Sequence, residues 1–391
     1  MICSRRVLLA AALVAAGSGL VACKRNNASA EGSATGAQKT GEIVIGHYAS
    51  MTGSTAHFGQ DTDKALRLAI DEANQAGGVR GQKLRVVTLD TRGDSAEAAN
   101  AVTRLIDVER ATAIVGEVAS SLSLAGGRVA QRRKIPMVSP SSTNPKVTEI
   151  GDYVFRVCFL DPFQGKVMAT FARQNLKLDR VAILRDVKND YSIGLADAFK
   201  SAFTSQGGSV VAEQSYSQGD TDFSAQVTAI KGTSAQAIFV PGYYSEVGAI
   251  ARTARRLGLE VPLLGGDGWD APDLVKIGGE ALEGSYFSNH FAPDAATPKA
   301  QKFVADFRAR YGQNPTGLGA LGYDAGAVLV DAMKRATSLE PSAIRDALAK
   351  TKDFVGVTGT ITIDAQRNAQ KSAVVLKIEN GKPRYEATIQ P

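Results

Sequence analysis

The stretch Ile114-Val115-Gly116-Glu117-Val118-Ala119-Ser120-Ser121-Leu122-Ser123-Leu124-Ala125-Gly126-Gly127 starts with apolar, β-branched residues and then changes to hydroxyl-bearing and small ones. The first part is typical of a buried β-strand, and the second is typical of a loop that leads into a helix. In an open parallel sheet, ligands bind beyond the carboxyl ends of the strands. We therefore expect Ala119 and Ser120 either to face a ligand or to cap the following helix.

Short β-branched runs alternate with amphipathic segments on both sides of this stretch. This pattern predicts repeated strand–helix–strand units and parallel sheets that are buried on both faces. It occurs twice along the chain, so we predict an α/β fold made of two similar, doubly wound parallel-sheet lobes. Helix starts are predicted at Asp94 and at Asp161, where Asp161 is expected to act as N-cap ahead of Pro162. The predicted strands are 42–49, 83–90, 111–118, 135–139, 180–185, 209–216, 235–240 and 262–264.

A second small, polar loop follows the strand that ends at Ser139. It contains Ser141, Ser142 and Thr143, and its position after the strand matches that of the loop at Ser120. Hydroxyl groups beside a helix N-terminus suit an anion such as a carboxylate. Either loop alone could merely cap a helix, but the matched positions favour a binding site.

The second half of the chain has aromatic and acidic residues at its strand ends. Tyr243 follows one predicted strand, and Asp267, Gly268 and Trp269 follow the next. If these residues face the hydroxyl groups of the first half, one lobe can hold a carboxylate and the other an ammonium group. The arrangement therefore suits a zwitterion.

The N-terminal segment is typical of an exported protein. Residues 1–22 have a basic start, an apolar run of secretory length and small residues before Cys23. The sequence Leu20-Val21-Ala22-Cys23 is similar to a bacterial lipobox, which implies a lipid on Cys23; an ordinary signal peptide with a chance cysteine is the alternative. We expect residues 23–41 to form a flexible tether and Cys158 to be a small core residue.

Composition excludes several classes of protein. The chain has 391 residues, 44% hydrophobic and 21% charged, with a formal charge of +6 and no basic run interleaved with aromatics, so nucleic acid is not an expected partner. We interpret the three histidines, His47, His57 and His290, as scattered surface or loop residues. We therefore expect no metal site, no cofactor and no enzymatic activity.

Several stretches resemble a known family. These are Ala49-Ser50-Met51-Thr52-Gly53-Ser54-Thr55-Ala56-His57-Phe58-Gly59-Gln60, the segment from Ile70 to Leu84 with its Ala76-Gly77-Gly78-Val79-Arg80-Gly81, and the loops at Tyr243 and Asp267. From about Glu42 to the C-terminus the chain resembles the periplasmic branched-chain amino acid binding proteins of ABC transporters. The resemblance implies a type I periplasmic binding fold with a three-crossover hinge. Lobe 1 would comprise residues 42–160 and 290–365, and lobe 2 residues 161–289 and 366–391.

The resemblance also implies roles for individual residues. Ser120 and Thr143 would bind the ligand carboxylate, with backbone groups of Ala119 and Ser141 nearby, and Ser141 and Thr143 would also offer oxygens to the ammonium group. Asp267 would pair with the ammonium group, Tyr191 and Tyr243 would close over the ligand, and Phe58, together with Leu318, would wall the pocket. We expect Trp269 either to fill part of the pocket or to contact an aromatic side chain of the ligand, whereas Arg185 is more often solvated or salt-bridged at such a position than directed at a ligand. The complete predicted ligand site is Phe58, Ala119, Ser120, Ser141, Ser142, Thr143, Tyr191, Tyr243, Asp267, Gly268 and Trp269.

The implied function is capture of a branched-chain or other aliphatic amino acid and its delivery to an ABC permease. The protein would be a monomeric lipoprotein of the periplasm or cell surface, attached to the membrane through Cys23. Two alternatives remain at this point: a ligand sensor for a signalling partner, and the same scaffold binding aromatic acids, amides or urea-like compounds.

Overall fold

The computed structural model describes residues 41–292 and 297–390. The predicted signal peptide, Cys23 and the predicted tether up to Thr40 lie outside these residues. Across the described residues, no helix combines the length and the apolar character needed to span a membrane.

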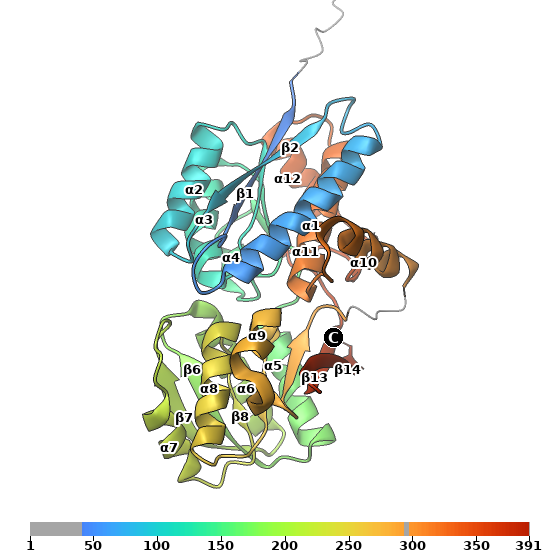
Figure 1. The fold of residues 1–391 in the computed structure, drawn as a ribbon. Helices are drawn as coiled ribbons and strands as arrows, with labels where there is room; N and C mark the ends of the chain where they lie inside the picture. The colour runs from blue at the N-terminus through green and yellow to red at the C-terminus, as the bar shows by residue number, and fades with distance from the viewer. Residues whose placement is uncertain (1–40, 293–296, 391) are drawn as a thin grey trace, which may run out of the picture. The chain divides into compact units, whose positions relative to one another are not determined.

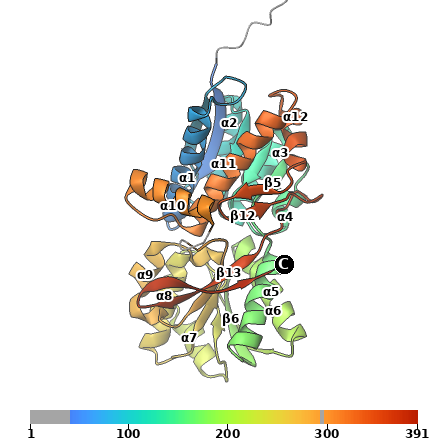
Figure 2. The ribbon, with the colours of Figure 1, turned by 90° about the vertical axis from the view of Figure 1, so that its right-hand side faces the viewer.

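The first sheet has five parallel strands in the order β2-β1-β3-β4-β5. Helices α1 and α11 lie side by side on one face, and α2 and α3 lie side by side on the other (Figures 1 and 2). The strands are therefore covered on both faces, which explains their β-branched, apolar composition. The elements are β1 (Ile43–Ala49), α1 (Ala56–Gln75), β2 (Leu84–Asp90), α2 (Ser95–Asp107), β3 (Ala113–Val115), α3 (Ser120–Arg133), β4 (Met137–Ser139), α4 (Lys146–Glu149), β5 (Val154–Arg156) and α11 (Gly317–Arg335).

The second sheet has seven strands in the order β14-β13-β10-β9-β8-β6-β7. Five of them are parallel, and they alternate with helices as predicted. These elements are α5 (Asp161–Thr170), η1 (Phe171–Asn175), β6 (Arg180–Asp186), α6 (Asp190–Ser205), β7 (Ser209–Tyr216), α7 (Ser224–Lys231), β8 (Ile238–Phe239), α8 (Tyr244–Arg256), β9 (Leu263–Gly265), η2 (Asp267–Trp269), α9 (Pro272–Gly278), η3 (Gly279–Leu282) and β10 (Tyr286–Asn289).

The expectation of purely parallel sheets is wrong at one edge. β13 (Ala373–Glu379) pairs antiparallel with β10, and β14 (Lys382–Ile389) pairs antiparallel with β13. The turn between them is Asn380-Gly381, with φ angles of 53° and 66°. Asn-Gly with two positive φ angles favours a tight hairpin, so this edge returns on itself without a crossover helix.

The remaining elements follow β10 and precede β13. They are α10 (Pro298–Tyr311), α11, α12 (Pro341–Ala349) and the small hairpin β11 (Phe354–Gly356) and β12 (Gly359–Ile361). The chain therefore passes from one sheet to the other after β5, after β10 and after β12. The lobe boundaries at residues 160/161, 289/290 and 365/366 remain our proposal for where these passages divide the chain.

One predicted cap forms and one does not. The Asp94 carboxylate accepts hydrogen bonds from the N–H groups of Ala96 and Glu97, so it caps α2 as expected. In α5 the N-cap is Leu160 and Asp161 is already the first helical residue, so the expected capping box with Gln164 is wrong. The side chains of Asp161 and Gln164 are thereby available for the site.

Candidate functional site

A small cavity lies beyond the carboxyl ends of the strands, where loops of both sheets meet. Its volume is about 10 Å³, close to the minimum that holds one water, so a larger solute can enter only if the surrounding loops move apart. Its lining residues are Phe58, Val118, Ser141, Tyr191, Tyr243, Asp267, Gly268 and Leu318. Of the predicted ligand-site residues, the structure thus gathers Phe58, Ser141, Tyr191, Tyr243, Asp267 and Gly268 around one space, with Leu318 beside them.

Aromatic rings form one wall of this cavity. Phe58 meets Tyr243 edge to face, with ring centroids 5.5 Å apart, and Tyr243 stacks on Tyr191 at 5.4 Å. Phe58 comes from the start of α1, whereas both tyrosines come from elements around the second sheet. The two halves of the chain therefore touch across the cavity, and together with Val118 and Leu318 they leave an apolar surface for a side chain.

Buried polar atoms without partners cluster beside this wall. Buried polar groups are normally hydrogen-bonded, and an unpaired one costs about 1–3 kcal/mol, so such a cluster points to a ligand. Hydroxyl groups can accept as well as donate, and the remaining oxygens act as acceptors, so the missing group must bring donors. Within the described part of the chain, the atoms that lack a partner here are Ser141 Oγ, Thr143 Oγ1, Tyr243 OH, Gln164 Oε1 and both carboxylate oxygens of Asp161.

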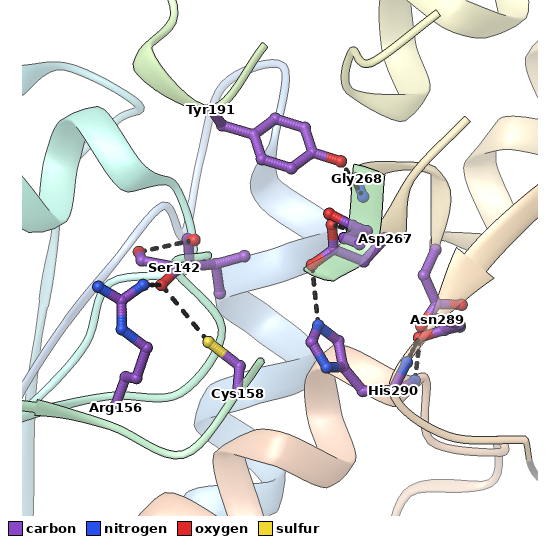
Figure 3. A network of polar contacts seen from close by, with 12 residues as sticks. Ser142, Arg156, Cys158, Tyr191, Asp267, Gly268, Asn289 and His290 are labelled. Atoms are coloured by element: carbon purple, nitrogen blue, oxygen red, sulfur yellow. Dashed lines mark hydrogen bonds and ion pairs between the residues drawn. The ribbon is translucent and has the colours of Figure 1, made fainter. Parts of the chain in front are cut away.

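Two side chains hold the Asp267 carboxylate in place. Gln164 Nε2 donates to Oδ1 at 2.8 Å, and His290 Nε2 lies 3.0 Å from Oδ2. Figure 3 shows the contact between His290 and Asp267. Burial lowers the pKa of His290, so its ring is neutral at pH 7 and donates to the carboxylate. The ring also stacks on Phe159 at 3.7 Å. His290 is a buried loop residue directly after β10, as the expectation of surface or loop histidines allows, but that expectation is wrong for His47, which is fully buried in β1.

Glu117 organises the two serine-containing loops. Its Oε1 accepts from the N–H and hydroxyl of Ser50 at 2.7 and 2.6 Å, and its Oε2 accepts from the Ala119 N–H at 2.7 Å. The carbonyl oxygen of Glu117 accepts from the hydroxyl groups of Ser123, Ser139 and Ser142. Burial raises the pKa of Glu117, and these donors oppose that rise. One residue thus ties together the loops that follow β1, β3 and β4.

Five predicted ligand-site residues do not line the cavity. The Ser142 hydroxyl forms hydrogen bonds between the two loops. Its partners are the carbonyl groups of Glu117 and Val118 and the hydroxyl of Ser123. Ala119 gives its N–H to Glu117, and Ser120 Oγ accepts from the N–H of Asn144 at 3.3 Å. Ala119, Ser120 and Ser142 therefore shape the loops around the cavity, whereas Thr143 keeps a buried hydroxyl without a partner in the described chain.

Trp269, the fifth, belongs to the core. Its indole N–H donates to the carbonyl of Val240 at 2.9 Å, its ring lies 5.8 Å from Phe287, and the residue is fully buried. The ring lies so close to Gly265 that a Cβ there would come within 2.1 Å of it. The expectation that Trp269 fills part of the pocket is therefore wrong, because η2 turns its side chain into the second sheet while Asp267 and Gly268 face the cavity.

Comparison with known proteins assigns the chain to a family. Residues 42–382 match the family model described as periplasmic binding protein. The chain belongs to the periplasmic binding protein family. A leucine binding protein, LivK, from Thermotoga maritima has a TM-score of 0.86 and 44% identity, covering 89% of this chain and 99% of that one.

Other relatives of this periplasmic binding protein have similar names. LivJ from Streptococcus pneumoniae, solved in complex with isoleucine, has a TM-score of 0.85 and 36% identity over 90% of this chain and 100% of that one. A Leu/Ile/Val-binding protein homolog from Brucella melitensis is 32% identical over 346 residues, 87% of this chain and 92% of that protein. The predicted type I periplasmic binding fold and the resemblance to branched-chain amino acid binding proteins of ABC transporters are confirmed.

Sequence reasoning missed four groups at the site of this periplasmic binding protein. Val118 is the last residue of the predicted strand 111–118, and its position directly before the polar loop could have identified it as a site residue. Asp161 and Gln164 were interpreted only as a helix cap. His290 follows the last parallel strand of the second sheet, β10, so the rule that ligands lie beyond strand ends could have identified it.

Proposed function

We propose that this chain captures a branched-chain or other aliphatic amino acid outside the cytoplasm and delivers it to an ABC permease. The observation that carries the proposal is the pairing of an apolar wall with a buried set of acceptors and hydroxyl groups that lack partners in the described chain. A free amino acid brings the three things that this cavity lacks: an apolar side chain, an ammonium donor and a carboxylate. The names of the relatives support the same ligand class.

Each part of the ligand has a matching group. Asp267 accepts from the ammonium group, and His290 and Gln164 hold the carboxylate in position for it. Thr143 and Ser141 provide hydroxyl groups, and the start of α3 adds the positive end of its dipole for the ligand carboxylate. Phe58, Val118 and Leu318 contact the aliphatic side chain.

Attachment to the membrane through a lipid on Cys23 and a monomeric state complete the proposal. The lipid anchor rests on the lipobox-like sequence before Cys23. The monomeric state rests on the cavity, whose lining residues belong to one chain. Incorporation of a labelled fatty acid, lost in Cys23→Ala, tests the anchor.

The central test replaces the acid. Asp267→Asn keeps the size of the side chain but removes the charge that pairs with the ammonium group. Because a hydrogen bond to a charged group contributes about 1.5–3 kcal/mol, we expect affinity for L-leucine to fall about 10- to 150-fold. Isothermal titration calorimetry measures it, with isoleucine, valine, benzoate and urea as comparison ligands.

Asp197→Asn is the matched control. Asp197 pairs with Arg185 at 2.7 Å on the outer side of the same half of the chain, away from the cavity, so this variant is expected to bind leucine normally. Equal affinity in wild type and Asp267→Asn would contradict the assigned role of the acid. Tighter binding of benzoate or urea than of any aliphatic amino acid would contradict the ligand class.

A further inference from the structure

The end of the first sheet that lies away from the cavity carries a surplus of positive charge. It consists of residues 41–42 and of three segments that lead from helices into β2, β3 and β4, namely 76–85, 104–112 and 132–136. Because β1 to β4 are parallel, these segments meet at one end of the sheet, which we call the basic pole. Its basic residues are Arg80, Lys83, Arg85, Arg104, Arg110, Arg132, Arg133 and Lys134.

Ion pairs account for the acids of the basic pole and leave several cations over. Each acid in these segments lies 2.7–3.7 Å from an arginine: Asp107 from Arg133, Glu42 from Arg85 and Glu109 from Arg104. Within the described residues, the cations of the pole that form no ion pair are Arg80, Lys83, Arg110, Arg132 and Lys134, and all five are exposed. Arg80 also donates to the carbonyl of Ala336, and Glu340 farther along that loop offsets only part of this charge.

The fold alone does not require these charges. Basic residues in the last turn of a helix complement the helix dipole, which accounts for the arginines that end α2 and α3. Lys83 and Arg110, however, lie beyond the helix ends. The equivalent loops of the second sheet, residues 206–208 before β7 and 232–237 before β8, contain no charged residue. The surplus at the basic pole therefore points to a partner of opposite charge.

An exposed apolar side chain belongs to the same pole. Among the large apolar side chains of the described residues, Val108 is the most exposed, at 66%, and it lies between Arg104 and Arg110 directly after α2. An anionic bilayer offers phosphate groups to the cations and an apolar boundary below them to the valine. The combination fits a membrane surface better than a partner that offers charge alone.

The chain that leads to Cys23 joins the fold at this pole. Residues 24–40 separate Cys23 from Gly41, so a lipid on Cys23 holds the pole within about 60 Å of the bilayer, at roughly 3.3–3.6 Å per residue. We propose that the basic pole docks on an anionic phospholipid bilayer, with Val108 at the headgroup boundary. This rests on the lipid proposed for Cys23. Docking turns the cavity, which lies beyond the opposite ends of the same strands, away from the bilayer.

The charge surplus sets the size of the expected effect. A basic residue near an anionic lipid surface strengthens binding about fivefold. Reversing the charge of two such residues is therefore expected to lower the ratio of docked to undocked protein at least about 25-fold. Salt at roughly 1 M shortens the screening length to about 3 Å, so it is expected to release the wild type as well.

Quenching by labelled lipid measures the contact. The mature lipoprotein is isolated with its lipid, carries a fluorophore on Val108→Cys, and is reconstituted into vesicles whose acyl chains are brominated. Cys158 is buried, so the label attaches at residue 108. We expect strong quenching on phosphatidylglycerol vesicles, little on phosphatidylcholine vesicles, and loss of quenching in Lys83→Glu combined with Lys134→Glu.

Matched controls test position and charge separately. Val187→Cys and Val355→Cys carry the same label at exposed valines outside the basic pole and are expected to stay unquenched. Lys166→Glu combined with Lys177→Glu makes the same change of charge in the second half of the chain, and Lys177 has a φ of 56°, close to the 54° of Lys134. This double variant is expected to keep the quenching at residue 108.

The outcomes separate docking from the proposed function. Equal quenching on both lipids overturns the role of charge, and equal quenching at residues 108, 187 and 355 overturns the role of the basic pole. An unquenched label at residue 108 on phosphatidylglycerol overturns the docking itself, whereas leucine affinity, measured by calorimetry, stays normal in both double variants. Failure to incorporate a labelled fatty acid overturns the anchor on Cys23, and the same quenching with unlipidated protein added to vesicles then tests the pole.

Discussion

At the scale of single residues, the site depends on how each polar group is supported. Asp267 is useful to a ligand because a neutral histidine and an amide already hold its two oxygens at 3.0 and 2.8 Å. Such fixed donors preorganise the carboxylate, so little reorganisation is needed when the ammonium group arrives. Glu117 does the same for the loops: it does not line the cavity, yet it binds Ser139 and Ser142, which flank Ser141 in the loop after β4.

Trp269 provides a residue-scale prediction. Trp269→Phe removes the indole N–H and leaves the buried carbonyl of Val240 without that donor. We expect the free energy of unfolding to fall by about 1–3 kcal/mol, measured by urea denaturation. Leucine affinity, measured by calorimetry, is expected to stay within about threefold of wild type. If the variant keeps normal stability but loses tenfold or more in leucine affinity, Trp269 contacts the ligand after all.

At the scale of elements, the starts of two helices from opposite halves of the chain are joined. Ser121 Oγ, in the first turn of α3, donates to Asp190 Oδ2 at 2.9 Å and accepts from the Asp190 N–H at 3.0 Å at the start of α6. Asn144 Nδ2 also donates to the Asp190 carbonyl at 2.7 Å. None of these three residues lines the cavity. These contacts stabilise the arrangement in which both halves surround the cavity.

Ser121→Ala tests this link. The variant removes the reciprocal hydrogen bonds, so the closed arrangement becomes less populated and apparent affinity falls although no ligand contact changes. From a net contribution of about 0.5–1.5 kcal/mol we expect leucine binding to weaken about 2- to 12-fold in calorimetry. Ser205→Ala, which removes a hydroxyl bonded within α6 to the Ala202 carbonyl, is the control. Similar affinities for both variants and wild type would show that the Ser121–Asp190 link does not contribute to closure.

At the scale of the whole molecule, Arg156, at the end of β5 where the first passage begins, connects to the last passage between the sheets. Its side chain binds carbonyl groups of the loop after β4, and its N–H donates to the carbonyl of Arg367, in the last passage, at 3.1 Å. Arg367 in turn donates to the Thr148 carbonyl at 2.8 Å. Periplasmic binding proteins close around their ligands by a hinge motion, and we propose the same motion for this chain. The passages would act as the hinge.

Small-angle X-ray scattering checks the motion. Saturating leucine is expected to reduce the radius of gyration, because the ligand contacts both halves only when they close. Asp267→Asn, at a leucine concentration below its own dissociation constant, is expected to show no reduction. An unchanged radius in wild type, with binding verified by calorimetry, would mean that the ligand enters without domain closure.

Much of this fold was readable from local pattern. The alternation of β-branched and amphipathic runs correctly placed β1 to β4 and β6 to β9 to within a few residues, because strands buried on two faces need apolar residues throughout. It did not predict β10, β13 or β14. The hairpin at Asn380-Gly381 was missed although its signal is local. The strand-end rule also pointed to the correct loops, and six predicted residues do line the cavity.

The sequence by itself thus determined the α/β class, the family and the loops that form the site, since periodicity, turn chemistry and family motifs are properties of short segments. Only the tertiary structure decided which side chains within those loops face the ligand. Asp267 and Trp269 are two residues apart, yet one faces the cavity and the other packs into the core. His290 and Asp161 become site residues only because the passages between the sheets bring them beside Asp267, and no local pattern carries that information.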